Sequence, residues 1–154
     1  MSSRNALPFA TTIHVRDICL CLHLQRAARV VARRFDEELR PHGLTNGQFS
    51  LLMSLNRPEP ATLASVSAVL GMDRTTVTAN VKPLVRRGLV TVSRNPADKR
   101  GRRLTLTTAG RVRLAAALPT WKRIHAEIER DLPSANAEGL RADLRALCAG
   151  STGA

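Results

Sequence analysis

Residues 72–106 read MDRTTVTANVKPLVRRGLVTVSRNPADKRGRRLTL, and this stretch decides the fold. Its pattern predicts a helix, a strand, a basic loop and a second strand. Within it, residues 73–103 hold nine Lys or Arg and two Asp, a local net charge of +7 out of +12 for the whole chain. Positive charge gathered on one helix and an adjoining hairpin is typical of a surface that docks on nucleic acid.

The residues just before this stretch predict a helix-turn-helix. A helix that begins after Thr62 should end at Gly71, where a left-handed cap residue fits, and Asp73 is a suitable N-cap for the next helix. That next helix, predicted over 74–87, has one apolar side. Its other side carries hydroxyls, a small side chain and cations, which suit the major groove. Pro83 should kink this helix without ending it.

Strands are predicted at 89–94 and 102–107, and the loop 95–101 between them should carry Lys99 and Arg100 at its tip. Further helices are predicted at 15–39, from Thr45, at 108–132 and at 136–148. Thr45 and Gln48 form a capping-box pattern. The apolar stripe of the first helix consists of Cys21, Leu24, Ala28, Val31, Phe35 and Leu39. Residues 1–12 and 150–154 are expected to be a loose arm and tail.

Composition narrows the class of protein. A chain of 154 residues predicts one domain, with or without helical extensions, and its net charge of +12 favours an acidic polymer as partner. No segment approaches the roughly 20 apolar residues that span a bilayer, so no membrane partner is expected. The N-terminus lacks a signal-peptide pattern, and three cysteines without an export signal predict reduced thiols in the cytoplasm.

A helix-turn-helix followed by a basic hairpin is a winged helix. With a long helix before it and two after it, the chain resembles the MarR family of bacterial transcriptional regulators over nearly its whole length. The stretches that carry the resemblance are GLTNGQF (43–49), LGMDRTTVT (70–78), RGLV (87–90), DKR (98–100) and LTLTTAG (104–110).

The resemblance implies a mainly α fold with a small β-hairpin, in which a winged helix-turn-helix is flanked by N- and C-terminal dimerisation helices. The implied divisions are a flexible arm (1–12), an N-terminal dimerisation helix (13–44), a DNA-binding domain (45–110) and C-terminal dimerisation helices (111–150). It also implies a homodimer that represses transcription from a pseudo-palindromic operator, with half-sites about 34–36 Å apart, and that a ligand releases.

Residues from the predicted helix and hairpin should contact double-stranded DNA. They are Arg74, Thr75, Thr76, Thr78, Ala79, Asn80, Lys82, Arg86, Arg94, Asp98, Lys99, Arg100, Arg102 and Arg103. Arg86, Lys99, Arg102 and Arg103 are expected to meet phosphates, and Thr75, Thr78, Ala79 and Asn80 to meet base edges. By resemblance, helix 74–87 enters the major groove and the segment 98–100 reaches the minor groove. Asp98 should orient Arg100, because phosphate repels a carboxylate.

By resemblance alone, a small aromatic or phenolic ligand should bind where the dimerisation helices meet the winged helix. The residues nominated for that site are Leu24, Arg26, Phe49, Met53 and Trp121. Most of these side chains have a competing interpretation as ordinary core. No residues assemble an active site, and the four histidines lack metal-ligand spacing, so neither an enzyme, a metal site nor a cofactor is expected.

Two alternatives remain open. Cys21 stands 24 residues before Thr45, and this spacing is similar to that of the reactive cysteine in hydroperoxide-sensing MarR members. Those proteins place tyrosines near the thiolate. At the corresponding positions this chain has Phe35 and Asn46. The competing interpretation is a small core residue. A disulfide from Cys19 to Cys21 is not expected, because side chains two apart on a helix point to different sides. A non-specific architectural DNA-binding protein explains the charge equally well, but not the flanking helices.

Overall fold

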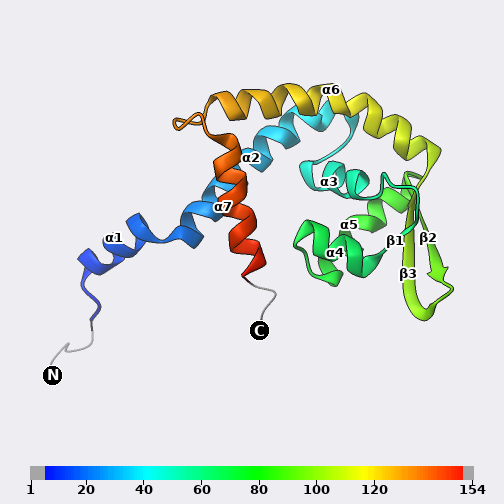
Figure 1. Ribbon diagram of the computed structural model, residues 1–154, viewed down its shortest axis with the longest axis horizontal. Helices are drawn as coiled ribbons and strands as arrows, with labels where there is room; N and C mark the ends of the chain where they lie inside the picture. Colours follow the sequence, from blue (N-terminus) through cyan, green and yellow to red (C-terminus); the bar gives the residue numbers. More distant parts are fainter. Residues whose placement is uncertain (1–5, 151–154) are drawn as a thin grey trace.

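The computed structural model describes residues 6–150, and within them the chain is mainly helical with one small sheet, as predicted. The elements are α1 (Phe9–Ile18), α2 (Leu20–Leu39), the 3-10 helix η1 (Arg40–His42), α3 (Asn46–Ser54), β1 (Ala61–Thr62), α4 (Leu63–Leu70), α5 (Arg74–Arg86), β2 (Val90–Asn95), β3 (Asp98–Leu106), α6 (Thr108–Arg130) and α7 (Ala137–Ala149). Helices α3–α5 and the sheet gather at one end of the molecule, while α2 and α6 lead away from them to α1 and α7 (Figure 1).

The N-terminal prediction is wrong in two respects. The first helix begins at Phe9 rather than near residue 15, and it is interrupted at Cys19, whose backbone is extended (φ −70°, ψ 104°). The predicted arm therefore holds four helical residues, 9–12, and its residues 1–5 lie outside the described chain, as do residues 151–154 of the predicted tail. The apolar stripe is buried only at its end, at Phe35 and Leu39, because no part of residues 6–150 covers the first half of α2.

The helix-turn-helix forms as the sequence predicts. Thr45 and Gln48 make a reciprocal capping box at the start of α3, and Thr62 caps α4. Gly71 ends α4 with φ 62°, a conformation that glycine adopts without steric cost. Asp73 then accepts a hydrogen bond from the Thr76 amide and caps α5, which continues through Pro83. These caps set the angle at which α5 leaves α4.

The sheet differs from the prediction in two ways. A third strand, β1, was not predicted; it pairs with β3, so the strand order is β1-β3-β2. The predicted loop 95–101 is also wrong, because Asn95 pairs with Asp98 across a two-residue turn and Asp98–Leu106 is one strand. Residues 99–101 form a bulge between this pair and the pairing of Arg94 with Arg102. We call residues 90–106 the wing.

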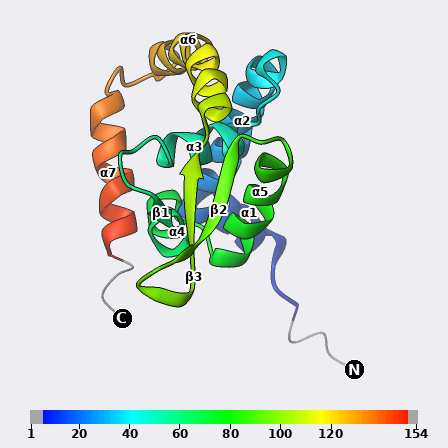
Figure 2. The same ribbon diagram turned by 90° about the vertical axis from the view of Figure 1, so that its right-hand side faces the viewer.

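One apolar core joins the winged helix to α2 and α6. It includes Leu51, Val77, Leu84, Leu104 and Ile124, each nearly or fully buried. In this core, α5 packs against β2, α4 packs against β3, and α3 contacts both α5 and α6. The wing, α5 and the long helices are therefore held as one packed body. Figure 2 shows the sheet beside α5, with α6 crossing above.

The start of α6 is fastened to the base of the wing. The Thr107 hydroxyl donates to the carbonyl of Gly88 (2.7 Å) and accepts from the amide of Gly110 (3.0 Å). Gly110 approaches the Leu89 carbonyl so closely that a Cβ there would lie 2.2 Å from its oxygen. The start of α6 is therefore held against the segment that joins α5 to β2.

Candidate nucleic-acid interface

Helix α5 turns one side to solvent. Val77, Val81 and Leu84 are buried beneath it. Its outward side forms a shallow hollow of about 300 Å³ lined by Arg74, Thr75, Thr78, Ala79 and Lys82. Five of the predicted DNA-contacting residues thus share one exposed surface, and Arg86 is exposed one turn further along. A convex helix with small and hydroxyl side chains flanked by cations fits the width of a major groove.

Thr76 and Asn80 do not share that surface. The Thr76 hydroxyl donates to Asp73 at 2.9 Å, as part of the helix cap. Asn80 is half-buried, and its amide nitrogen lies 3.8 Å from the sulfur of Met72. The bonds to Thr76 lower the pKa of Asp73, so this carboxylate is ionised and engaged with its own helix.

The wing brings its cations toward α4 and α5. Arg100 and Arg102 line a hollow of about 290 Å³, together with Arg74 and the first residues of α4. Arginines from two separate elements therefore converge on one concave space. Sequence reasoning missed the other wall of this hollow, Thr62, Leu63 and Ala64, because the two-residue strand β1 is too short to give a periodic signal.

Asp98 acts on the backbone of Arg100. Its Oδ1 accepts from the Arg100 amide at 3.0 Å, and the amide of Ala97 donates to Asn95 Oδ1 at 3.1 Å. These two bonds shape the turn and the bulge. No ion pair joins Asp98 to the Arg100 guanidinium within residues 6–150, so Asp98 orients Arg100 through the main chain.

Adjacent arginines of β3 lie on opposite faces of the sheet, because side chains alternate along a strand. Arg102 is exposed on the face that carries Leu104 toward α5. Arg103 is half-buried on the other face, opposite Thr62 and Ser93, and its Nε is buried without a hydrogen-bond partner among the described residues. Of the two, only Arg102 lies beside the exposed side of α5.

The cations of this surface lie apart from the ion pairs found in residues 6–150. We call the exposed residues Arg74, Thr75, Thr78, Ala79, Lys82, Arg86, Arg94, Lys99, Arg100 and Arg102 the basic face. None of its Lys or Arg residues forms an ion pair within the part of the chain that the structure describes. Arg94 and Arg102 are even paired directly across the β-ladder, where like charges repel. A polyanion would relieve this repulsion.

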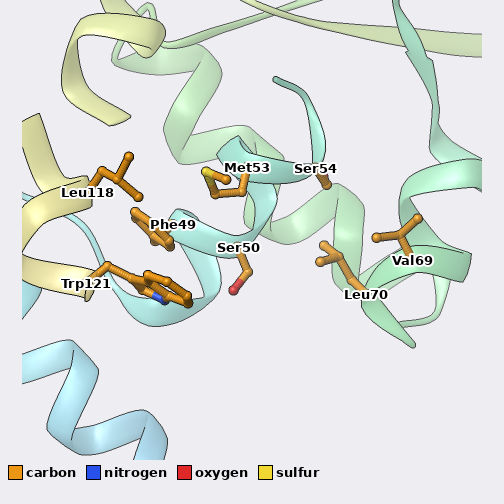
Figure 3. A pocket seen from close by; sticks show the side chains of 8 residues that line it. All are labelled: Phe49, Ser50, Met53, Ser54, Val69, Leu70, Leu118 and Trp121. Carbon is orange, nitrogen blue, oxygen red and sulfur yellow. The ribbon is translucent and has the colours of Figure 1, made fainter. Parts of the chain in front are cut away.

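Three of the five residues nominated for a ligand site come together. Phe49, Met53 and Trp121 line a cavity of about 380 Å³, with Ser50, Ser54, Val69, Leu70 and Leu118 (Figure 3). We call it the α3–α6 cavity. Trp121 stacks on Phe49 at 5.9 Å and on His125 at 4.7 Å between ring centroids. Val69 and Leu70 belong to α4, and this contribution could not be predicted before the helices were placed.

Leu24 and Arg26 lie elsewhere. Both are exposed on the first half of α2, and neither lines the α3–α6 cavity. The lining therefore contains no charged side chain. Within a single subunit the cavity suits an uncharged aromatic or phenolic group better than a carboxylate.

Two of the three cysteines, Cys21 and Cys148, are exposed, and Cys19 is half-buried. Cys21 is exposed, with the Gln25 amide nitrogen 3.2 Å from its sulfur, so its interpretation as a core residue is wrong for the isolated chain. Cys19 caps α2, and its Sγ accepts from the Leu22 amide. The argument that placed Cys19 and Cys21 on one continuous helix does not hold, because Cys19 is at the break. Among the described residues, no three His, Cys, Asp or Glu side chains gather as a metal site.

No helix in residues 6–150 has both the length and the apolar character needed to cross a membrane.

Comparison with known proteins adds an independent line of information. The model of the MarR family matches residues 42–101, which include the helix-turn-helix and most of the wing. The uncharacterized HTH-type transcriptional regulator YwoH of Bacillus subtilis (strain 168) is 33% identical over 84 residues, 54% of this chain and 61% of its own length. The chain thus spans less than two thirds of that relative.

Solved structures match over more of the chain. The transcriptional regulator MosR of M. tuberculosis, crystallised in complex with DNA, is 35% identical, with a TM-score of 0.78 over 86% of this chain and 96% of its own. BpsR of Bordetella bronchiseptica, whose DNA binding is regulated by 6-hydroxynicotinic acid, is 28% identical, with a TM-score of 0.71 over 80% and 94%.

Proposed function

The chain belongs to the MarR family of transcriptional regulators, and we propose that it binds a pseudo-palindromic operator as a homodimer, represses transcription there, and is released by a small molecule. One observation carries the proposal: the Lys and Arg residues of the basic face have no acidic partner among the described residues, although they lie beside a solvent-exposed recognition helix. Membership of a family of transcriptional regulators also favours a regulatory function over an enzymatic one.

In the proposed complex, α5 lies in the major groove. Thr75, Thr78 and Ala79 face base edges, while Lys82 and Arg86 contact phosphates on either side. The wing follows the adjacent backbone toward the minor groove. Its contacts come from Arg94, Lys99, Arg100 and Arg102. Asn80 and Arg103 are less exposed than these residues, so we assign them weaker roles than the sequence predicted.

Dimerisation is supported by apolar side chains that remain uncovered by the described part of the chain. No residue of α1 or α7 is buried. Exposed apolar residues on α1, α2 and α7 include Phe9, Val15, Ile18, Leu20, Leu24, Val30, Val31, Leu140, Leu144 and Leu147. A run of this kind is typical of a surface that packs against a second copy. We propose residues 13–44 and 111–150 as the dimerisation segments and 45–110 as the DNA-binding domain.

The α3–α6 cavity is the proposed effector site. Its walls come from α3, from α4 of the helix-turn-helix and from α6, so a ligand there touches both the DNA-binding domain and a proposed dimerisation helix. A small aromatic or phenolic compound that fits one angle between these helices better than another would change the spacing of the two α5 helices. Release requires such a difference in affinity between the two states.

The direct test is a footprint on the intergenic DNA beside the gene. We expect two protected half-sites about one helical turn apart and a preference over random duplex of about 10³-fold or more. Light scattering should give the mass of a dimer. A monomer at working concentration, or equal affinity for all duplexes, would reject the proposal and favour a non-specific architectural protein.

Arg100→Ala is the matched variant for this test. It should weaken operator binding and reduce the salt dependence without lowering the melting temperature, because Arg100 is exposed and its structural bond is made by its backbone. Wild-type affinity and salt dependence in this variant would remove Arg100 from the interface.

Oxidation at Cys21 is a second candidate control mechanism, favoured by the exposure of its thiol. Under this alternative, cumene hydroperoxide releases the wild-type protein from its operator but does not release Cys21→Ser. Unchanged binding of the wild type in an excess of oxidant would eliminate the alternative.

A further inference from the structure

Two arginines from different helices converge on Gly43, in the short connection between η1 and α3. Arg87 is the C-cap residue of α5, and Arg113 lies in the second turn of α6. A Cβ added at Gly43 would lie 3.0 Å from a terminal nitrogen of Arg87 and 3.1 Å from one of Arg113. Gly43 has φ 65°, which glycine adopts without steric cost, and its missing side chain leaves room for both guanidinium groups. We call Gly43, Arg87 and Arg113 the arginine corner.

The positive charges of this corner are not compensated by the described part of the chain. The two nitrogens lie within about 6 Å of each other, a separation at which like charges repel. Neither arginine forms an ion pair among residues 6–150. Arg113 donates to the carbonyl of His42 at 2.8 Å, and this bond holds its guanidinium at the corner. Both side chains are exposed, so an anion from solvent can reach them and relieve the repulsion.

The arginine corner is separate from the basic face and from the proposed dimerisation surface. Arg87 follows Asn80 by two helical turns, so it lies on the side of α5 that Asn80 occupies and not on the side of Thr78 and Lys82. Figure 1 shows the start of α6 at the end of the molecule away from α1 and α7. An anion at this corner therefore touches neither the residues assigned to base edges nor the exposed apolar residues of α1 and α7.

We propose that the arginine corner binds a doubly charged phosphate, either free or as the terminal group of a small metabolite. Two guanidinium groups supply a charge of +2, which matches the charge of about −1.5 to −2 on a phosphate monoester at neutral pH. A carboxylate or a phosphodiester of a DNA backbone carries a single charge and would leave one arginine uncompensated. The forked guanidinium also donates parallel hydrogen bonds to neighbouring phosphate oxygens.

A phosphate held here joins three parts of the molecule. Arg87 ends the recognition helix, Arg113 begins the long helix α6, and the His42 carbonyl belongs to η1. The bound anion would therefore stabilise the folded protein, because the unfolded chain does not bring these groups together. The corner is also separate from the α3–α6 cavity, since neither arginine lines that cavity. It is a second effector site, independent of the one proposed above.

Calorimetry on the DNA-free protein tests the site without any operator. The probes are sodium phosphate and glycerol 3-phosphate at constant ionic strength and neutral pH, with acetate and dimethyl phosphate as singly charged controls. We expect saturable binding of both probes at one site per subunit, and binding of both controls that is weaker by about tenfold or more. Tighter binding of glycerol 3-phosphate indicates a metabolite as the ligand, and tighter binding of inorganic phosphate indicates the free ion.

Variants of the corner separate it from other cations of the chain. Arg87→Gln and Arg113→Gln should each raise the Kd for phosphate about tenfold or more. Arg87→Gln is the decisive variant, because no hydrogen bond of its side chain to described residues is lost and its melting temperature without phosphate should match the wild type. Arg111→Gln is the matched control. It removes one cation from the same turn of α6, where Arg111 faces Asn56, and should keep the Kd within about twofold.

The basic face supplies the competing location for a bound anion. The triple variant Lys82→Gln, Arg86→Gln, Arg102→Gln should retain phosphate binding. Loss of binding in the triple variant with retention in Arg87→Gln would overturn the proposal, as would the absence of saturable binding or equal affinity for dimethyl phosphate. Phosphate binding at the corner by a protein that fails to select DNA would instead reject the proposed function alone.

Discussion

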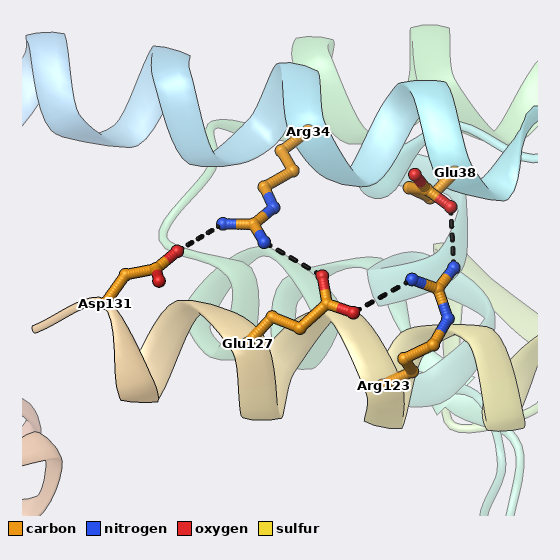
Figure 4. Close-up of polar contacts among 5 residues, drawn as sticks. All are labelled: Arg34, Glu38, Arg123, Glu127 and Asp131. Atoms are coloured by element: carbon orange, nitrogen blue, oxygen red, sulfur yellow. Dashed lines mark hydrogen bonds and ion pairs between the residues drawn. The ribbon is translucent and has the colours of Figure 1, made fainter.

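Arginine serves opposite purposes in two regions of this molecule. Between α2 and α6, Arg34 donates to Glu127 (2.9 Å) and Asp131 (2.8 Å), and Arg123 donates to Glu38 (2.6 Å) and Glu127 (3.1 Å), forming a continuous chain of ion pairs (Figure 4). We call these five residues the α2–α6 ladder. On the basic face, by contrast, no Lys or Arg has an acidic partner among residues 6–150.

The difference teaches that net charge alone does not locate a binding surface. Both regions contain arginines, but in the ladder each arginine is paired with two carboxylates, and these ion pairs join two antiparallel helices. The basic face instead places like charges opposite each other, as at Arg94 and Arg102. Such an arrangement costs free energy in the isolated chain and is offset only when an anion binds. Unpaired cations, rather than cations as such, therefore distinguish the proposed interface from the ladder.

Neutralising the basic face should give the largest effect. In the triple variant Lys82→Gln, Arg86→Gln, Arg102→Gln, operator affinity should fall at least about 100-fold, and the slope of log Kd against log salt should shrink by about 5 per dimer. The melting temperature should not fall, because no ion pair is lost. Fluorescence anisotropy and calorimetry measure the two properties. A variant that loses stability but keeps its salt slope would show that these cations are structural.

Variants of the adjacent residues Arg102 and Arg103 should show which face of the wing approaches DNA. Arg102→Gln should weaken operator binding about tenfold and reduce the salt slope by about 2 per dimer, whereas Arg103→Gln should reduce it by less than about 1. The reason is that Arg103 is half-buried on the opposite face of β3. Equal losses in both variants would mean that the wing approaches DNA with its other face.

The ladder should respond in the opposite way. Glu127→Gln removes the acceptor shared by Arg34 and Arg123, so the melting temperature should fall modestly, and less in high salt, where exposed ion pairs are screened. Operator affinity should stay within about twofold of the wild type. A large loss of operator affinity in a folded protein would indicate that the ladder also sets the spacing of the two α5 helices.

The smallest effect should be a loss of folding stability at acidic pH. Hydrogen bonds from Arg34 and then Arg123 hold the pKa of Glu127 below the ordinary glutamate value of 4.5. Its contribution to stability is therefore complete above pH 4.5 and is lost as the pH falls through the lowered pKa of the folded protein. Urea unfolding between pH 3 and pH 7 measures this change. In Glu127→Gln the acid limb should be shallower, and an unchanged limb would contradict the assignment.

The helix-turn-helix could be predicted because its signals are local. Thr45 with Gln48, Gly71 and Asp73 each determine a cap within a few residues of sequence. The break at Cys19 could not be predicted, because no Pro or Gly marks it, and the two-residue strand β1 exists only through its partner β3. For the wing, the predicted length of the loop was wrong because a bulge lets residues 98–101 join a strand despite their loop-like composition.

The candidate site was predictable where helical spacing fixes a face and not where the fold brings elements together. The spacing of Thr75, Thr78 and Lys82 predicts one shared exposed surface, and all three line the hollow on α5. Asn80 lies two residues from Thr78 and points to another side, where Met72 covers it. The lining of the α3–α6 cavity could be predicted only with knowledge of the position of α4 beside α3 and α6. Spacing along one helix carries no information about that position.

Salt titration of operator binding tests the central claim most directly. If Lys82, Arg86, Arg100 and Arg102 of both subunits meet phosphates, about eight contacts form and log Kobs should fall against log salt with a slope of about −7. The same titration should leave the melting temperature of the free protein nearly unchanged, because the ion pairs that salt screens lie at the surface and each contributes little to stability. A slope near zero would show that the unpaired cations of the basic face do not hold DNA.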